Sequence, residues 1–164
     1  MKIYHGSDIV VKEPKILQSN RLLDFGIGFY TTSNKEQAVR WAKKVGSRNN
    51  TGKEFLSVYN FDIEKAKNEL RIIEFLVADE KWLDFITANR RGKELLEKYD
   101  IVMGPVADDN VYLTVKLFET GVLDKEETLK RLKIEKLFNQ ILFHTDKALN
   151  FCVFDHYEDL GGQR

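Results

Sequence analysis

Apolar and polar residues alternate along the chain in short runs that predict several strands. Phe55–Phe61 is rich in aromatic and β-branched residues, which favour a strand. Asp100–Pro105 is typical of a buried strand, because its apolar run ends at Gly-Pro. Further short strands are predicted at Lys2–Tyr4, Phe29–Thr32, Leu70–Leu76, Gln140–His144 and Phe151–Asp155.

Four other segments have apolar residues at helical spacing: Lys35–Val45, Lys81–Asn89, Asp109–Glu119 and Lys125–Leu132. We expect the first to begin at the capping box Ser33-Asn34-Lys35-Glu36, to bury Trp41 on its apolar stripe and to end at Gly46. Strands lie at both ends of the chain with helices between them, and the two do not alternate regularly. This order predicts an α+β fold rather than a doubly wound one.

Length and charge narrow the class of protein. The 164 residues suit one compact domain spanning 1–164, and 43% apolar content is that of a globular chain. The net charge is zero, so the chain has no general attraction to nucleic acid or to anionic membranes. The single cysteine, Cys152, fits a reducing compartment, and no apolar run is long enough to cross a bilayer. We therefore expect a cytoplasmic protein that has no contact with a membrane.

Three short motifs carry the candidate chemistry. His5-Gly6-Ser7 ends the first predicted strand, Gly26-Ile27-Gly28-Phe29-Tyr30 leads into the second, and Gln140 lies on a late strand. The paired glycines permit a tight turn that could deliver bulky aromatic rings to a cleft. The simpler alternative is that they only form a corner of the chain.

In their order along the chain and in their local sequence, these motifs resemble the signature of ADP-ribosyltransferases of the diphtheria-toxin and poly(ADP-ribose)-polymerase branch. That signature has a His on the first strand, a Tyr after a Gly-x-Gly-aromatic turn and a Glu late in the chain. The whole chain also resembles a bacterial family of unknown function within that clan, whose members carry YHGS, DFGxGFY, GPVADD and a late Gln-containing strand followed by FHT. The resemblance implies split antiparallel β-sheets that form an NAD-binding cleft flanked by helices.

The same resemblance implies NAD+ as co-substrate and His5, Tyr30 and Gln140 as the catalytic residues. His5 would hold a hydroxyl of the adenosine ribose through a ring nitrogen, and Tyr30 would stack on the nicotinamide ring. The backbone of Gly6 is a candidate for the carboxamide contact. The implied NAD+ contacts are His5, Gly6, Ser7, Gly28, Tyr30 and Trp41, the last as a second aromatic wall.

Two positions depart from the pattern of these relatives. Gln140 stands where they usually have Glu, which binds the ribose 2-hydroxyl and stabilises the positive charge of the transition state. An amide oxygen accepts the same hydrogen bond without a full charge, which weakens this stabilisation by about 1–2 kcal/mol, or about ten-fold in rate. Gln is also a poor general base, so polymer elongation is disfavoured. Ala38 stands where relatives often have a Ser that binds the carboxamide.

Other candidate residues each have a simpler alternative role. Arg90 and Arg91 could clamp the pyrophosphate, or they could be a solvated helix end. Asp108 and Asp109 could hold a cationic acceptor, although capping a helix is the simpler role. His144 could touch the acceptor, because it lies four residues after Gln140 on the same face of a strand, or it could only pack.

These features predict an NAD+-dependent mono-ADP-ribosyltransferase that modifies a macromolecule, protein or nucleic acid. By analogy with such small transferases, it would be a toxin component neutralised by a partner protein. An NAD+ glycohydrolase, or an inactive NAD+ or ADP-ribose-binding module, remains the alternative. The basic stretch Lys35–Lys53 would suit a nucleic-acid acceptor. Such a run is usually only the solvent-exposed face of an amphipathic helix, so a nucleic-acid acceptor is not favoured. The histidines and Cys152 show no ligand spacing, so no metal is expected.

Overall fold

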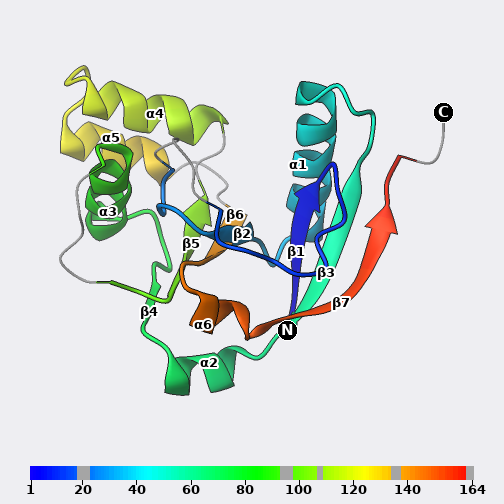
Figure 1. The fold of residues 1–164 in the computed structure, drawn as a ribbon. Coiled ribbons are helices and arrows are strands. Elements are labelled where there is room, and N and C mark those ends of the chain that lie inside the picture. The colour runs from blue at the N-terminus through cyan, green and yellow to red at the C-terminus, as the bar shows by residue number, and fades with distance from the viewer. Residues whose placement is uncertain (18–22, 93–97, 107–108, 134–137, 162–164) are drawn as a thin grey trace.

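The computed structural model describes residues 1–17, 23–92, 98–106, 109–133 and 138–161, and its strands form two sheets. The three-stranded sheet has the order β1-β3-β7 and is antiparallel throughout. Its strands are β1 (Lys2–Ser7), β3 (Phe55–Phe61) and β7 (Cys152–Asp159). Mixed helices and two separate sheets confirm the α+β class (Figure 1).

The four-stranded sheet has the order β2-β6-β5-β4. It is formed by β2 (Phe29–Thr31), β6 (Phe138–Phe143), β5 (Ile101–Val106) and β4 (Ile72–Glu74). β4 pairs with β5 in parallel, so the expectation of wholly antiparallel sheets is wrong at this edge. A parallel pair needs a crossover connection, and the chain between β4 and β5 supplies one that contains a helix.

The helices divide between the two sheets. α1 (Lys35–Arg48) lies along β1, whereas α3 (Glu80–Arg90), α4 (Asp109–Glu119) and α5 (Lys125–Leu132) gather beside the four-stranded sheet (Figure 1). The short helices α2 (Ile63–Glu69) and α6 (Asp146–Leu149) lie together at the opposite end. The bounds of α4 and α5 agree with the sequence prediction, including the Asp124 cap.

α1 differs from its prediction at three points. Asn34, not Ser33, caps the helix, because its side chain accepts a hydrogen bond from the Gln37 amide at 2.8 Å. The helix passes through Gly46 to Arg48, and Gly46 is buried inside it. Trp41 is 49% exposed, so the prediction that it lies on the buried stripe is wrong.

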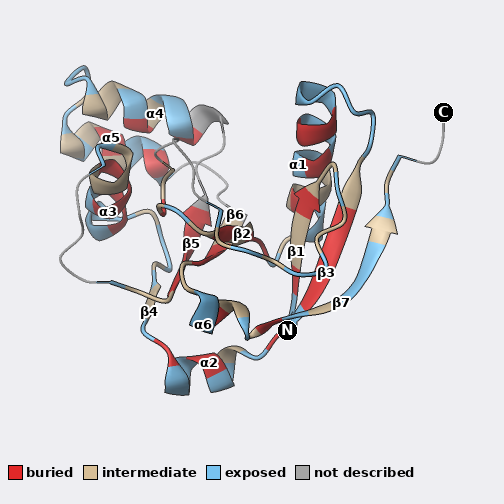
Figure 2. Ribbon diagram, in the orientation of Figure 1, coloured by how far each residue is buried: buried red, intermediate tan, exposed pale blue. Residues whose placement is uncertain are grey.

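Two main groups of buried side chains hold the fold together (Figure 2). One joins the two sheets and includes Ile3, Tyr59 and Phe143. The other seats α3, α4 and α5 on the four-stranded sheet and centres on Trp82, whose indole N–H donates to the Pro105 carbonyl at 3.0 Å. Burial of such large apolar side chains contributes about 1.5–3 kcal/mol each.

Candidate functional site

The two sheets meet at one backbone bridge between β1 and the end of β2. Tyr4 and Thr32 exchange both of their backbone hydrogen bonds, at 2.8 and 3.0 Å. Among the described residues this is the only bridge between β1 and the β2 segment, so the sheets separate beyond it. We call the point of separation, formed by His5–Gly6 on one side and Tyr30 on the other, the fork.

Backbone alternation determines which groups face the fork. Successive residues of a strand direct their N–H and C=O to opposite edges, so the backbone groups of Gly6 point to the same edge as those of Tyr4. By the same rule the backbone N–H and C=O of Tyr30, two residues before Thr32, point toward β1. Met1 supports this register, because it exchanges backbone hydrogen bonds with Phe61 on the β3 edge. The amide and carbonyl of Gly6 therefore point into the opening.

The His5 side chain makes a hydrogen bond to the backbone carbonyl of Tyr30, across the fork. Its Nδ1 lies 2.8 Å from the Tyr30 carbonyl oxygen, and a carbonyl only accepts, so Nδ1 carries the proton and donates. The ring packs on Phe29 with 4.6 Å between ring centroids. Burial lowers the pKa of His5, although the hydrogen bond to Tyr30 opposes this shift, so the imidazole is neutral at neutral pH.

The close packing of α1 on β1 accounts for the residue types at Gly6 and Ala38. A Cβ on Gly6 would lie 2.8 Å from the amide nitrogen of Ala42 and still closer to the carbonyl oxygen of Ala38. The glycine thus lets α1 lie directly against β1, a reason that the sequence motif did not reveal. Ala38 is buried against β3 beside Leu56, so its methyl group packs in the core.

Beside the fork lies a pocket of about 430 Å³, which we call the Tyr30 pocket. Its wall contains Tyr30 from β2, Trp41 from α1 and Gln140 from β6, three predicted residues from three different elements. His5, Gly6, Ser7 and Gly28, the other predicted NAD+ contacts, do not line this wall; His5 and Gly6 are at the fork. Trp41 is therefore exposed because it lines a pocket instead of packing in the core.

The two glycines of the Gly-x-Gly motif shape this wall. Gly26 has φ +89°, a conformation that favours glycine, and its carbonyl accepts the Tyr30 hydroxyl at 2.5 Å. A Cβ on Gly28 would collide with the Phe143 carbonyl, so glycine is needed for the close approach to β6. Burial raises the pKa of Tyr30, and the charge of Asp24 raises it further, so the phenol stays protonated.

The structure adds four polar or aromatic residues to the Tyr30 pocket that sequence reasoning missed: Asp24, Tyr112, Lys116 and Glu119. The last three are spaced i, i+4 and i+7 on α4, which places them on one helix face and could have revealed them. Asp24, Tyr112 and Glu119 contact Arg90, which also lines the pocket.

The Arg90 side chain is 9% exposed, and its two terminal nitrogens are buried. Its Nε donates to Asp24 at 2.5 Å, one terminal nitrogen lies 3.8 Å from the Glu119 carboxylate, and its guanidinium carbon lies 4.7 Å from the centre of the Tyr112 ring. Both terminal nitrogens are buried without a hydrogen-bond partner in the described part of the chain. The predicted pocket arginine is thus present, paired with carboxylates rather than open to solvent.

Residues 1–154 match the model of a family described as a protein of unknown function (DUF3990). The chain belongs to the DUF3990 family. Comparison with curated proteins found no match, and neither did comparison with solved structures.

Of the remaining predicted residues of this DUF3990 chain, Arg91 and His144 do not line the Tyr30 pocket. Arg91 is exposed at the end of α3. His144 lies beside Gly26, and its pKa is lowered by burial and raised in part by hydrogen bonds to the backbone of Ile27 and Phe25, so it supports the glycine turn. Asp108 lies outside the described residues, and Asp109 begins α4 with a side chain that is likewise not described.

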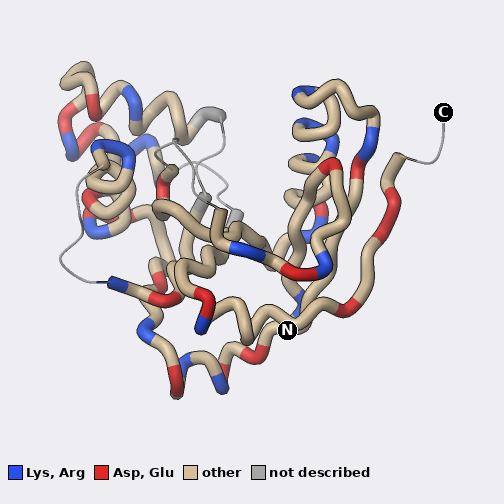
Figure 3. Tube along the Cα trace, viewed as in Figure 1, with Lys and Arg blue, Asp and Glu red and all other residues tan. Residues whose placement is uncertain are grey.

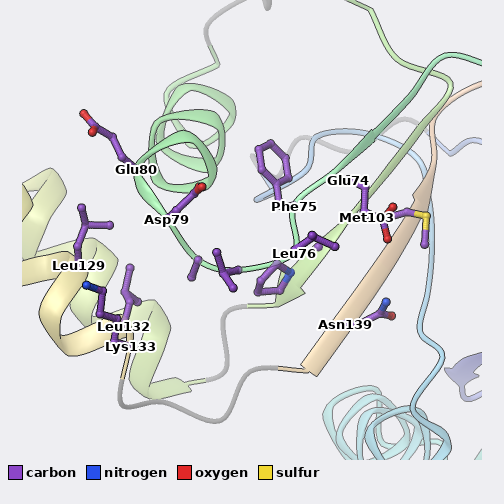
Figure 4. Close-up of a pocket in the computed structure, with 14 residues that line it drawn as sticks. Glu74, Phe75, Leu76, Asp79, Glu80, Met103, Leu129, Leu132, Lys133 and Asn139 are labelled. Carbon is purple, nitrogen blue, oxygen red and sulfur yellow. The ribbon is translucent and has the colours of Figure 1, made fainter.

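A larger cavity of about 690 Å³ is formed by the β4–α3 connection, the end of β5 and the end of α5 (Figure 4). Its wall is largely apolar and includes Leu76, Met103 and Leu132. Asn139 reaches it from β6, whereas Gln140, the next residue, points to the other face and lines the Tyr30 pocket. Because no predicted site residue that the structure describes lines the larger cavity, we place the candidate site of the DUF3990 chain in the smaller one.

The basic residues of α1 form a visible row in Figure 3. Lys35 is paired with Glu158 of β7 at 2.7 Å, and the Lys44 ammonium lies 5.7 Å from the Trp41 ring centre. Within the described ranges, no group of three or more His, Cys, Asp or Glu side chains is placed to hold a metal ion. None of the described helices of this DUF3990 protein is long and apolar enough to cross a membrane.

Proposed function

We propose that this protein is an NAD+-dependent mono-ADP-ribosyltransferase that transfers ADP-ribose to a macromolecular acceptor, protein or nucleic acid. The observation that carries the proposal is the convergence of Tyr30, Trp41 and Gln140 on one pocket beside the fork. These are the residues that the resemblance to the diphtheria-toxin and poly(ADP-ribose)-polymerase branch singles out. A bacterial toxin role and a neutralising partner protein remain part of the proposal by analogy alone.

Two features of the site suit a nicotinamide group. The rings of Tyr30 and Trp41 offer apolar faces to a flat cationic pyridinium ring, which aromatic faces attract. The Gly6 backbone, at the fork, offers a donor and an acceptor on the same edge, which complements the acceptor and donor of a primary carboxamide. The pocket volume of about 430 Å³ lies within the range of small-molecule sites.

The proposed reaction breaks the bond between the anomeric carbon of the ribose and the nicotinamide nitrogen. The bonding electrons pass to the ring nitrogen, which leaves as neutral nicotinamide, and the nucleophile of the acceptor bonds to the anomeric carbon. Gln140 would accept a hydrogen bond from the ribose 2-hydroxyl and orient the sugar. It supplies no charge to the transition state.

The neutral Gln140 also supports a second candidate, a domain that binds NAD+ or ADP-ribose with little or no turnover. A glycohydrolase would use the same pocket with water as the nucleophile. The three candidates differ in two measurable quantities: the release of nicotinamide and the transfer of label to a polymer.

The test uses NAD+ labelled on the adenine side, with and without a cell lysate, and follows nicotinamide release together with label on protein and nucleic acid. Trp41→Ala and Gln140→Ala are compared with wild type, and Tyr157→Ala is the matched control. Tyr157 is an aromatic residue of β7 with 48% exposure, close to that of Trp41, and it lies outside the pocket.

Label that is lost in the two site variants but retained in Tyr157→Ala supports the transferase. Nicotinamide release without labelled polymer identifies a glycohydrolase. NAD+ binding without release identifies a binding module. If NAD+ neither binds nor reacts, the proposal is wrong.

A further inference from the structure

The proposed reaction requires a group that removes a proton from the nucleophile, and Gln140 cannot do so. A neutral amide has no basic lone pair at neutral pH. Of the residues in the wall of the Tyr30 pocket, two carry carboxylates, Asp24 and Glu119. The pocket therefore contains carboxylates contributed by other parts of the chain.

The contacts of the two carboxylates differ. Asp24 accepts the Nε–H of Arg90 at 2.5 Å, a short charge-assisted hydrogen bond to one of its two carboxylate oxygens. Glu119 lies 3.8 Å from a terminal nitrogen of Arg90, which is too long for a hydrogen bond. Its side chain is 19% exposed, and it lines the same pocket as Gln140. Asp24 is equally exposed, so the difference is that Glu119 makes no side-chain hydrogen bond among the described residues.

The surroundings of Glu119 fix its position. It ends α4, whose Tyr112 packs on the Arg90 guanidinium, and Arg90 is tied to Asp24 on the far side. The buried guanidinium therefore holds the last turn of α4 against the turn that carries Asp24. Its positive charge attracts the Glu119 carboxylate, which lies 3.8 Å from a terminal nitrogen.

Building on the function proposed above, we propose that Glu119 is the general base of this site. As the bond from the anomeric carbon to nicotinamide breaks, the nucleophile forms its bond to that carbon, and its proton passes to the Glu119 carboxylate. Nicotinamide leaves with the electron pair, so charge and atoms balance. Gln140 orients the ribose, and Glu119 supplies the proton acceptor that a glutamate at position 140 would otherwise provide.

The test compares wild type with Glu119→Gln, Glu119→Ala and the control Glu126→Gln. Glu126 is an exposed glutamate of α5 that pairs with Lys130 and does not line the pocket. For each protein we measure NAD+ affinity by calorimetry, the melting temperature, and nicotinamide release with and without a cell lysate. Glu119→Ala is also assayed with added formate, a small carboxylate that can occupy the vacated space.

We expect Glu119→Gln to bind NAD+ within about two-fold of wild type while nicotinamide release falls about 100-fold, the low end of what a general base contributes. Formate should restore part of the release in Glu119→Ala, which a purely structural role of Glu119 would not produce. Glu126→Gln should match wild type.

Wild-type turnover in Glu119→Gln would overturn this assignment and leave the proposed function standing. So would loss of turnover that formate does not restore, or loss that parallels a fall in melting temperature. If wild type itself releases no nicotinamide, the proposed function fails and this assignment fails with it.

Discussion

Replacing Gly6 with alanine tests whether the seat of α1 on β1 determines the candidate site. The added Cβ would lie 2.8 Å from the Ala42 nitrogen and 2.9 Å from the Ala38 carbonyl carbon, with the Ala38 oxygen nearer still. Real Cβ atoms essentially never approach a heavy atom within 3.0 Å. All of these atoms belong to the helix backbone, so no side-chain rotation relieves the contact, and α1 must move away from β1.

The cost of that displacement can be approximated. Overpacking a well-packed core costs about 1–3 kcal/mol, and a clash with backbone belongs at the upper end. For a chain of this size, about 3 kcal/mol lowers the melting temperature by about 6–12 °C. Because α1 also carries Trp41, the same shift moves that ring relative to Tyr30 and Gln140, and NAD+ affinity should fall along with stability.

The assay is thermal unfolding followed by circular dichroism, with NAD+ titration well below the transition. Gly161→Ala is the control, because its Cβ would have its nearest contact at 3.5 Å, an ordinary van der Waals distance. The control should stay within about 0.5 kcal/mol of wild type. A Gly6→Ala protein that melts within about 2 °C of wild type would refute the close packing of α1 on β1.

Three further predictions concern the site and its buried groups. Gln140→Glu should raise the rate of nicotinamide release about ten-fold by adding a charge beside the developing cation, and an unchanged rate would argue against that role for position 140. Cys152 is buried and the pKa of its thiol is raised to about 12, so a thiol reagent should modify it only after unfolding; rapid modification of the native protein would contradict this burial. The pKa of His144 is lowered from 6.5 by burial, so below that pH the unfolded chain binds more protons than the folded one and stability falls with acidification. Urea unfolding between about pH 7 and pH 5 should therefore show a smaller loss in His144→Asn than in wild type, and equal losses in the two proteins would contradict the shifted pKa.

Local sequence signals were sufficient where no distant contact overrides them. α4 and α5 have regular apolar spacing, and Asp124 caps α5 by accepting a hydrogen bond from the Glu127 amide at 2.8 Å. β3 is a run of strand-forming residues, and its bounds agree with the prediction. In these segments the residues that form the element also determine its ends.

Contacts between distant segments explain the errors. Gly46 has the sequence of a helix end, yet it lies inside α1, where a Cβ would collide with the Lys53 carbonyl, so packing rather than capping selects glycine. Asn34 rather than Ser33 is the N-cap of α1, because the Ser33 hydroxyl donates a hydrogen bond to the Asn139 side chain at 3.1 Å. The parallel pairing of β4 with β5 is likewise a non-local outcome that residue patterns do not encode.

The residues of the candidate site show the same difference between local sequence signals and distant contacts. The motifs identified Tyr30 and Gln140, because each lies within a distinctive local sequence, and both line the pocket. They did not identify Glu119, because its spacing from Tyr112 and Lys116 gives only a shared helix face, and its contact with Arg90 depends on how α4 packs. A motif can mark residues that lie within one local sequence, but the residues that complete the pocket depend on how this chain packs.

The hydrogen bond from His5 links the architecture of the fork to the chemistry proposed for it. Since Nδ1 donates to the Tyr30 carbonyl, the neutral ring has its lone pair on Nε2. That tautomer can accept a hydrogen bond from a ribose hydroxyl but cannot donate one at Nε2. Protonation would remove the acceptor, and burial opposes protonation by lowering the pKa of His5. The same contact that joins the two sides of the fork therefore fixes the tautomer that suits the hydroxyl contact implied by the resemblance and proposed above.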